Sequence, residues 1–292
     1  MARRSPIDLL EPRRAALAAA LPPALDGDRG GVHQARVASR RLRELVPVWP
    51  GLDDRDARRA QKRLRRVTRT LGRVRELDVS AGLYEQLIQD ARPHPLAQAA
   101  VVRALTAARA AALRAARRAW TARSVARLWE AVAALDAAPG AIEDVGAAAA
   151  ARMATRQHQA REAIAHVGVL YEPERLHAVR IAAKRWRYAL EIANDVSPSR
   201  PAAALLARLK ALQERLGRAH DLHVLAEHLH DVENRLVSRS RPAARDVRQL
   251  IRRIDAECRQ LHAAFLTHHA DVAAVQAPAE RGRPRGRRRT AA

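Results

Sequence analysis

Two segments of the chain carry nearly the same pattern of residues. Residues 32–46 read VHQARVASRRLRELV, and residues 176–190 read LHAVRIAAKRWRYAL. At an offset of 144 residues, each segment has a His near its start, an Arg three positions later and further basic residues after it. The matched positions are His33 and His177, Arg36 and Arg180, Arg40 and Lys184, Arg41 and Arg185, and Arg43 and Arg187. This agreement predicts two helices of the same design.

A second pair of matching segments follows later in the chain. Residues 71–79 read LGRVRELDV, and residues 216–224 read LGRAHDLHV, at an offset of 145 residues. Two motifs that recur in the same order at nearly one offset indicate an internal repeat. The break at Pro139 and Gly140 is the natural boundary, so we expect a first half over 1–139, a second half over 140–270 and a disordered basic tail over 271–292.

The composition indicates helices throughout. Ala, Leu, Arg and Glu dominate, and all four favour helices. Gly and Pro cluster at a few breaks, and the segments between them have apolar residues at helical spacing. No stretch alternates apolar and polar residues long enough to predict a strand. The fold class is therefore all-α, and each half is long enough to form a four-helix bundle.

The repeated helix has one basic side and one apolar side. Helical spacing places Arg36, Arg40 and Arg43 within about 80° of His33. The apolar residues of the same segment, with Leu42 near their centre, lie on the opposite side. The second copy divides in the same way, with Arg41 and its counterpart flanking the basic side. We expect the apolar side to enter the core and the basic side to bind a ligand.

A helix predicted over residues 53–73 adds a second basic stripe. Lys62, Arg66, Arg69 and Arg73 follow the spacing i, i+4, i+7, i+11, and therefore lie on one face of that helix. The corresponding face of the second half is poorer in cations, and its basic residues include Lys210 and Arg218. The first half is therefore expected to contribute more of the binding.

The overall charge points to an anionic partner. The chain has 54 Lys and Arg against 31 Asp and Glu, for a formal net charge of +23. Only three of the 54 basic residues are Lys, and all three lie in or beside the repeated motifs. A charge of this size destabilises a compact chain by self-repulsion unless an anion neutralises it.

Other classes of protein fit the sequence less well. One cysteine cannot form an intrachain disulfide, and no stretch approaches 18 uninterrupted apolar residues. We therefore expect a cytoplasmic protein with no membrane segment. The sequence leaves the oligomeric state open.

Two alternatives to simple anion binding involve other chemistry. His220, His223 and Glu227 share one helix face, which is the arrangement of a metal site, but no matching element occurs elsewhere in the chain. Cys258 and His262 stand one helical turn apart without an oxyanion element. Both arrangements are more typical of ordinary helix surfaces, so no metal, cofactor or catalytic residue is expected.

A third alternative is non-specific binding of nucleic acid. The net charge fits, and the tail sequence RGRPRGRRR is typical of a phosphate-binding arm. However, the chain has only eight Phe, Tyr and Trp residues. Trp120, Trp129 and Trp186 all lie in predicted helices, where a core position is more common than a stacking platform.

The motifs resemble those of the CHAD family, the conserved histidine α-helical domain. The hallmark of that family is a His-x-x-Arg helix with further basic residues that occurs twice, each followed by a Leu-Gly segment ending in a polar pair. Here the polar pairs are Arg75–Glu76 and His220–Asp221. The resemblance covers roughly residues 5–270, and four motif matches in the right order make it specific.

The resemblance implies two four-helix bundles related by a pseudo-two-fold axis, with a basic central channel that binds inorganic polyphosphate. Some members associate with polyphosphate granules. Many accompany a catalytic domain marked by a Glu-x-Glu-x-Lys strand, which this chain lacks, so a stand-alone binding module rather than an enzyme is expected. The residues expected to contact polyphosphate are His33, Arg36, Arg40, Arg41, Arg43, Lys62, Arg66, Arg69, Arg73, Arg75, His177, Arg180, Lys184, Arg185, Arg187, Lys210 and Arg218.

Overall fold

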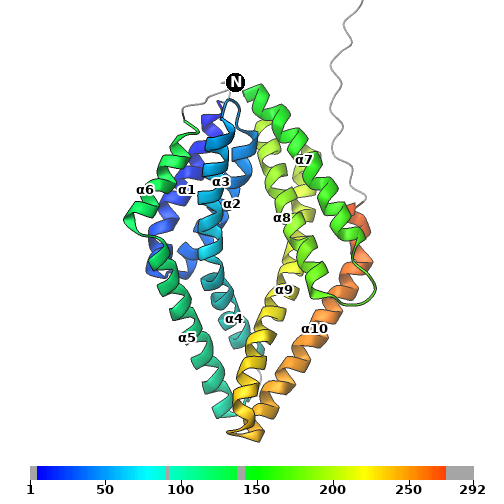
Figure 1. Cartoon of the computed structure of the whole chain (residues 1–292). Coiled ribbons are helices and arrows are strands. Elements are labelled where there is room, and N and C mark those ends of the chain that lie inside the picture. The colour runs from blue at the N-terminus through cyan, green and yellow to red at the C-terminus, as the bar shows by residue number, and fades with distance from the viewer. Residues whose placement is uncertain (1–4, 90–91, 137–141, 274–292) are drawn as a thin grey trace, which may run out of the picture.

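The computed structural model describes residues 5–89, 92–136 and 142–273, and within these ranges the chain is helical and contains no strand (Figure 1). The all-α prediction is confirmed. The helices are α1 (Ile7–Asp26), α2 (Arg29–Leu45), the short 3-10 helix η1 (Val46–Val48), α3 (Asp54–Thr70), α4 (Gly72–Ile88), α5 (Pro95–Ala119), α6 (Ala122–Ala133), α7 (Ile142–Ala165), α8 (Pro173–Val196), α9 (Arg200–Val237) and α10 (Arg241–Ala273).

Local sequence explains where several helices begin. The side chains of Asp28, Asp53, Thr121 and Ser199 each accept a hydrogen bond from a backbone N–H of the first turn that follows. These are the residue types that satisfy the free N–H groups of a helix start. At the end of α1, Gly27 has φ of 95°, a left-handed conformation that favours glycine.

The helix predicted over 53–73 is confirmed as α3 over Asp54–Thr70, but it ends three residues earlier than predicted, because α4 begins at Gly72. Arg36 of α2 donates a hydrogen bond from Nη1 to the carbonyl of Thr68, at 2.5 Å, in the last turn of α3. Gly72 begins α4, and a Cβ at this position would lie 2.9 Å from the same Nη1. The guanidinium therefore occupies the corner between the two helices.

The second half has no such break. Its counterpart of Gly72 is Gly217, which lies inside the 38-residue helix α9 and has open space around its Cβ position. The helices otherwise correspond: α8 begins 144 residues after α2, and α9 begins 146 residues after α3. One uninterrupted helix in the second half thus corresponds to α3 and α4 in the first.

Three clusters of buried apolar side chains hold the helices together. The first joins α1, α2, α3 and α6, and the third joins α7, α8 and the first part of α9. The second joins α4 and α5 of the first half to α9 and α10 of the second. In Figure 1 these four helices converge at the lower end of the molecule. Each half thus covers apolar surface of the other.

Two predicted boundaries fall partly or wholly outside the described residues. The expected boundary at Pro139 and Gly140 lies in the gap between 136 and 142. Helix α10 runs to Ala273, and the rest of the predicted tail, 274–292, is also outside the described residues.

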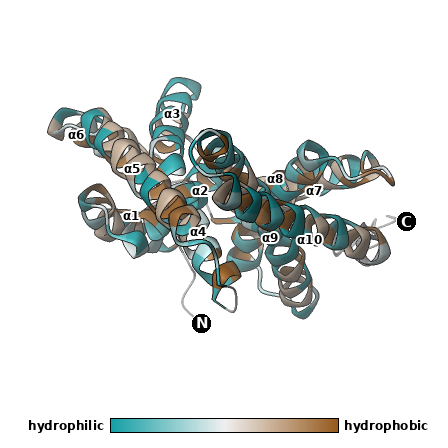
Figure 2. Cartoon of the chain, turned by 90° about the horizontal axis from the view of Figure 1, so that it is seen from below, coloured by the Kyte–Doolittle hydropathy of each residue, from teal (hydrophilic) through white to brown (hydrophobic). Residues whose placement is uncertain are grey.

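The predicted division of the repeated helix into two faces is largely confirmed. Leu42 and Leu45 of α2 and Trp186 and Leu190 of α8 are buried in the core. Ala182 is only partly buried. Figure 2 shows hydrophilic and hydrophobic residues alternating around α9 and α10, as expected for helices with one face in the core.

Helix α5 contains a long apolar stretch. Of the described helices, only α5 is long and apolar enough to cross a membrane, by length and composition alone. Most of its apolar stretch is exposed, whereas Ala97, Val101 and Leu105 are buried against the second cluster. Arg103 and Arg109 interrupt the stretch.

Candidate functional site

A pocket of about 700 Å³ lies between the two repeats and is lined by residues of α2, α3, α4, α8 and α9. We call it the central pocket. It collects the repeated positions in pairs, one member from each half of the chain. The pairs are His33 and His177, Arg36 and Arg180, Val37 and Ile181, Arg40 and Lys184, Arg75 and His220, and Glu76 and Asp221. Thr68, Arg69, Gly72, Arg73 and Val79 complete the lining.

The central pocket has a strong excess of positive charge. Its lining includes seven Arg and Lys side chains but only two carboxylates, for a formal charge of +5 when the three imidazoles are neutral. One carboxylate, Asp221, lies 3.6 Å from Arg180. Five positive charges thus remain without a carboxylate to balance them. A pocket of this kind favours an anionic ligand.

The two central arginines are held in different ways. Arg36 is fixed by its hydrogen bond to the end of α3, and burial lowers its pKa to about 10, with Arg40 adding to the effect. Arg180 faces the uninterrupted α9, and its buried Nε has no hydrogen-bond partner. Burial also lowers the pKa of Arg180. Both guanidiniums remain charged and have donor capacity to spare for an anion.

The histidines of the central pocket form one close pair. Nδ1 of His177 lies 3.1 Å from Nδ1 of His220, so one ring donates a hydrogen bond and the other accepts it. The pKa of His220 is lowered to about 3, mainly by burial, with the charges of Arg180 and His177 contributing. Burial is also the main cause of the lowered pKa of His177 and of His33, to which neighbouring cations contribute. The empty pocket therefore holds neutral imidazoles at pH 7.

Lys184 is the most perturbed cation in the central pocket. Burial lowers its pKa to about 7, and the charges of Arg180 and Arg40 act in the same direction. The unfolded chain binds a proton at this Lys up to about pH 10.5, so the folded state binds fewer protons between about pH 7 and 10.5. Folding stability therefore decreases as the pH falls through this range.

Because burying a charged Lys184 costs folding free energy, we expect Lys184→Met to stabilise the protein. At pH 7 the variant should raise the midpoint of thermal unfolding by roughly 5 °C, because the cost of a buried ammonium disappears. The difference should shrink toward pH 10.5. Thermal unfolding followed by circular dichroism measures it, with the exposed Lys210→Met as the control. A destabilised Lys184→Met protein would contradict the prediction.

Nine of the seventeen predicted residues line the central pocket, and the other eight lie outside it. Arg43, Lys62 and Arg185 line a second basic pocket, which is formed by residues of α2, α3, α7 and α8. Arg66 donates to the carbonyl of Ala119 and stacks over Trp120. Arg218 pairs with Glu257 of α10 at 2.8 Å, and Lys210 is exposed on α9. The predicted stripe is therefore divided. Lys62 lines the second basic pocket, Arg66 bonds to Ala119, and Arg69 and Arg73 line the central pocket.

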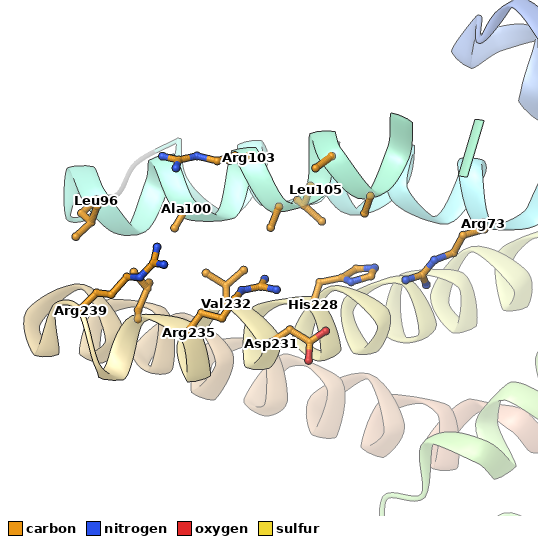
Figure 3. A pocket seen from close by; sticks show the side chains of 14 residues that line it. Arg73, Leu96, Ala100, Arg103, Leu105, His228, Asp231, Val232, Arg235 and Arg239 are labelled. Carbon is orange, nitrogen blue, oxygen red and sulfur yellow. The ribbon is translucent and has the colours of Figure 1, made fainter. Parts of the chain in front are cut away.

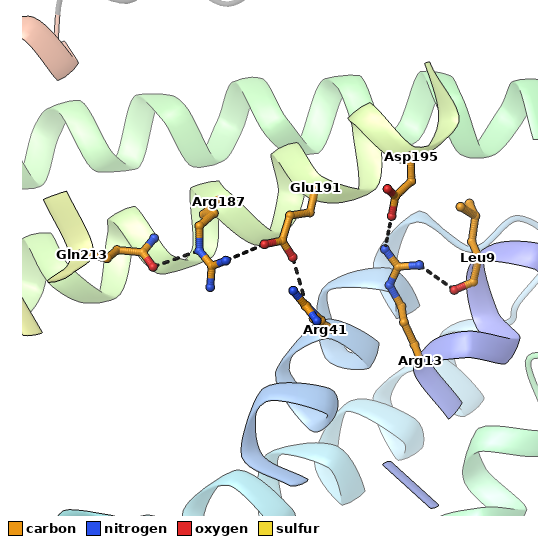
Figure 4. Close-up of polar contacts among 7 residues, drawn as sticks. All are labelled: Leu9, Arg13, Arg41, Arg187, Glu191, Asp195 and Gln213. Atoms are coloured by element: carbon orange, nitrogen blue, oxygen red, sulfur yellow. Dashed lines mark hydrogen bonds and ion pairs between the residues drawn. The ribbon is translucent and has the colours of Figure 1, made fainter. Parts of the chain in front are cut away.

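Arg41 and Arg187 share one carboxylate as an ion-pair partner. Glu191 of α8 accepts a hydrogen bond from Arg41 of α2 at 3.1 Å and from Arg187 at 2.6 Å (Figure 4). Arg187 also donates to the side chain of Gln213 at 2.9 Å. These contacts link α2, α8 and α9. Both arginines have a structural role that helix spacing by itself did not indicate.

Three ionisable residues of the central pocket were not among the predicted contacts: Glu76, His220 and Asp221. The signal for them was present in the repeat. At an offset of 145 residues, both motifs have a basic or imidazole side chain followed by an acid. Acids oppose anion binding, so the anion-binding pattern by itself does not point to Glu76 or Asp221. The structure places one of them beside Arg180, where it partly offsets the repulsion between cations.

A different cavity, of about 480 Å³, lies between α5 and α9 (Figure 3). Leu105 of α5 and Val232 of α9 line it from opposite sides, and Arg103, Arg235 and Arg239 also belong to its lining. It shares only Arg73 with the central pocket. Since alanines make up much of its α5 side, this cavity offers fewer donors to an anion.

The structure also places the residues of the two catalytic alternatives. Among the described residues, no group of three or more His, Cys, Asp or Glu side chains is arranged to hold a metal ion. His223 and Glu227 come no closer than 3.9 Å. Cys258 is buried, and burial raises the pKa of its thiol. His262 lies 3.1 Å from the carbonyl of Gly168.

Comparisons with known proteins agree with the resemblance seen in the motifs. No curated protein matches the chain. The crystal structure of the CHAD domain from the plant Ricinus communis is similar, with a TM-score of 0.63 and 21% sequence identity. The alignment covers 94% of this chain and 89% of the plant chain, which shows a shared fold. The family model for the CHAD domain matches residues 8–230. The chain therefore belongs to the CHAD domain family.

Proposed function

We propose that this protein binds inorganic polyphosphate in the central pocket. The observation that carries the proposal is the set of seven cations against two carboxylates, supplied by matched positions of both repeats. Arg side chains bind phosphate oxygens through paired, charge-assisted hydrogen bonds. A polymer with about one charge per phosphate therefore complements this lining. We further infer that the repeats form two bundles related by a pseudo-two-fold axis, with the pocket as part of a channel between them.

The lining favours polyphosphate over nucleic acid. No Phe, Tyr or Trp lines the central pocket, so bases would find no ring of these types to stack on. Trp120 and Trp186 are buried in the apolar clusters. A ligand with phosphates but without bases or sugars therefore matches the cations of this lining.

Competition calorimetry tests the proposal directly. The protein is titrated with long-chain polyphosphate at about 0.15 M salt, alone and with duplex DNA or RNA at equal phosphate charge. We expect binding that neither nucleic acid displaces. Equal competition by DNA or RNA would instead favour the alternative, a non-specific nucleic-acid-binding protein. No heat and no complex would overturn the proposal.

The affinity should increase as the pH falls. Bound polyphosphate favours the protonated form of Lys184, whose pKa in the free protein is about 7. Above pH 7 the protein must therefore take up a proton to bind, which weakens the observed affinity. We expect roughly tenfold weaker binding at pH 8.5 than at pH 7. Protonation of His33 and His177 should strengthen binding further below pH 6.5, because their pKa values are lowered in the free protein.

The Lys184→Arg variant separates this effect from general changes in charge. Arg stays protonated throughout the range, so the affinity of the variant should change little between pH 7 and 8.5. Calorimetry in two buffers with different ionisation enthalpies counts the protons taken up. An equally steep pH dependence in the variant would show that another group is responsible.

We also propose that the protein binds the polymer without cleaving it, as a cytoplasmic module that associates with polyphosphate granules. The central pocket has two carboxylates, Glu76 and Asp221, and Asp221 is paired with Arg180. A lining in which cations outnumber carboxylates in this way is suited to binding phosphates. Incubation of the protein with polyphosphate and measurement of released orthophosphate tests the first point. A fluorescent fusion in polyphosphate-rich cells tests the second.

A further inference from the structure

The cavity between α5 and α9, which we call the α5–α9 cavity, has a different character from the central pocket because more than half of its lining is apolar. Its volume of about 480 Å³ lies within the usual range for pockets that bind small molecules, about 300–1,000 Å³. The apolar residues of the lining are Leu96, Ala100, Ala104, Leu105, Ala107, Ala108, Val232 and Leu236.

Small side chains on α5 leave this space open. Four alanines of the lining follow the spacing i, i+4, i+7, i+8 and therefore share one face of α5; they are Ala100, Ala104, Ala107 and Ala108. On α9, Val232 and Leu236 line the cavity with buried side chains. Apolar atoms that border a void lack contacts on one side. An apolar group that enters the cavity gains these contacts and is itself removed from water.

The polar part of the lining is mainly cationic. With His228 neutral, four Arg and one Asp give the lining a formal charge of +3. Among the described residues, no carboxylate lies within ion-pair distance of Arg103, Arg235 or Arg239. The carboxylate of Asp231 does not point toward α5 in Figure 3. The cavity therefore combines an apolar surface with cations that have no acidic partner.

Arg235 and Arg239 are placed to bind one acidic group together. They are one turn apart on α9, where their like charges repel each other. Figure 3 shows both side chains extending from α9 toward α5. An acidic group that accepts hydrogen bonds from both guanidiniums relieves this repulsion. Val232 and Leu236 each lie three residues before one of these arginines, so apolar surface adjoins the charges.

We propose that the α5–α9 cavity binds an anionic amphiphile, a small molecule with one acidic head group and an apolar chain, such as a long-chain carboxylate. The head group accepts hydrogen bonds from Arg235 and Arg239, and the chain lies between the alanine face of α5 and Val232. Polyphosphate suits this cavity less well, because it is charged along its whole length and would lose hydration against the apolar side. The proposal is independent of the function of the central pocket, with which the cavity shares only Arg73.

Titration calorimetry with dodecanoate, below its micelle concentration, tests the proposal on the full chain. We expect one molecule to bind per chain, with a negative heat-capacity change from burial of the apolar chain. Butanoate has the same head group with a shorter chain, and dodecyltrimethylammonium has a long chain with a cationic head. Both should bind at least about tenfold more weakly than dodecanoate. No binding of dodecanoate, or equal affinity for either of the other compounds, would overturn the proposal.

Two variants test the two parts of the site separately. Arg235→Gln with Arg239→Gln removes the cations for the head group, and both residues are exposed, so the fold should be retained. Ala104→Leu fills the space for the chain without a change in charge. Each should weaken dodecanoate binding by at least about tenfold. Ala104→Leu should leave the affinity for polyphosphate within about twofold, because Ala104 does not line the central pocket.

Matched controls change exposed residues of the same helices outside the cavity. They are Arg208→Gln with Arg215→Gln on α9, and Ala111→Leu on α5. Their affinity for dodecanoate should stay within about twofold of the unmodified protein. Losses as large as in the cavity variants, or full affinity in the cavity variants, would show that dodecanoate binds elsewhere and would overturn the proposal. Circular dichroism checks helicity, and if Ala104→Leu loses it, the arginine pair decides.

Discussion

Replacing Arg40 and Lys184 together by Glu is expected to abolish polyphosphate binding, with a loss of affinity of more than about 1,000-fold, or about 4 kcal/mol. These residues occupy matched positions of the two repeats, and both line the central pocket. The double replacement leaves five cations and four carboxylates there, so the formal charge falls from +5 to +1. The new carboxylates also compete with phosphate for Arg36 and Arg180.

A control with the same change in total charge makes this result specific. Arg208→Glu with Arg215→Glu also lowers the net charge by four, but both residues are exposed on α9 and lie outside the pocket. Its affinity should fall by less than about tenfold at 0.15 M salt, because screening weakens charges that do not touch the ligand. Calorimetry measures both variants, and circular dichroism checks their helicity. Similar losses in the two proteins would show that net charge, rather than the pocket, determines binding.

The largest effect on stability is expected from Gly31→Ala, two residues before His33. A Cβ on Gly31 would lie 2.7 Å from the backbone nitrogen of Ala24 and 2.9 Å from the carbonyl carbon of Pro23. Backbone atoms cannot yield as a flexible side chain can, so α1 and α2 must move apart. We expect a loss of about 3 kcal/mol and a thermal midpoint lower by roughly 6–12 °C.

The same substitution at Gly82 provides the comparison. Gly82 lies inside α4, and its Cβ position has open space around it. Because Ala favours a helix more than Gly does, Gly82→Ala should stabilise the protein by about 0.5–1 kcal/mol. Thermal unfolding of the two variants should therefore shift in opposite directions. A Gly31→Ala protein as stable as the original would mean that α1 and α2 do not approach as closely as the structure shows.

The arrangement of charge in this molecule lowers the stability of the free protein. Lys184 with its lowered pKa, the unpartnered Nε of Arg180 and the excess charge of the central pocket and the second basic pocket each oppose folding of the empty protein. An anionic ligand that binds the folded state offsets these costs by mass action. Polyphosphate should thus raise the thermal midpoint more than it would in a protein whose cations are all paired.

The sequence by itself determined the features that depend on local periodicity. Helix propensity and apolar spacing identified the all-α class, and the repeat identified the family and the matched positions that line the central pocket. The buried faces of α2 and α8 followed from the same spacing, because the side of a helix to which a residue points depends only on its position in the chain. His33, Arg36, Arg180 and Lys184 were located in this way.

Tertiary structure decided which cations have partners, because ion pairs join residues that are far apart in the chain. Glu191 pairs with Arg41 across two helices, and Glu44 is paired with Arg152, 108 residues away. At the break beside Gly72 the corner is occupied by the guanidinium of Arg36, which comes from another helix and is not indicated by residues 53–73. Burial, which lowers the pKa of Lys184, likewise exists only after the helices have packed. Helical periodicity shows which way a side chain faces, but only the packed helices determine what it meets there.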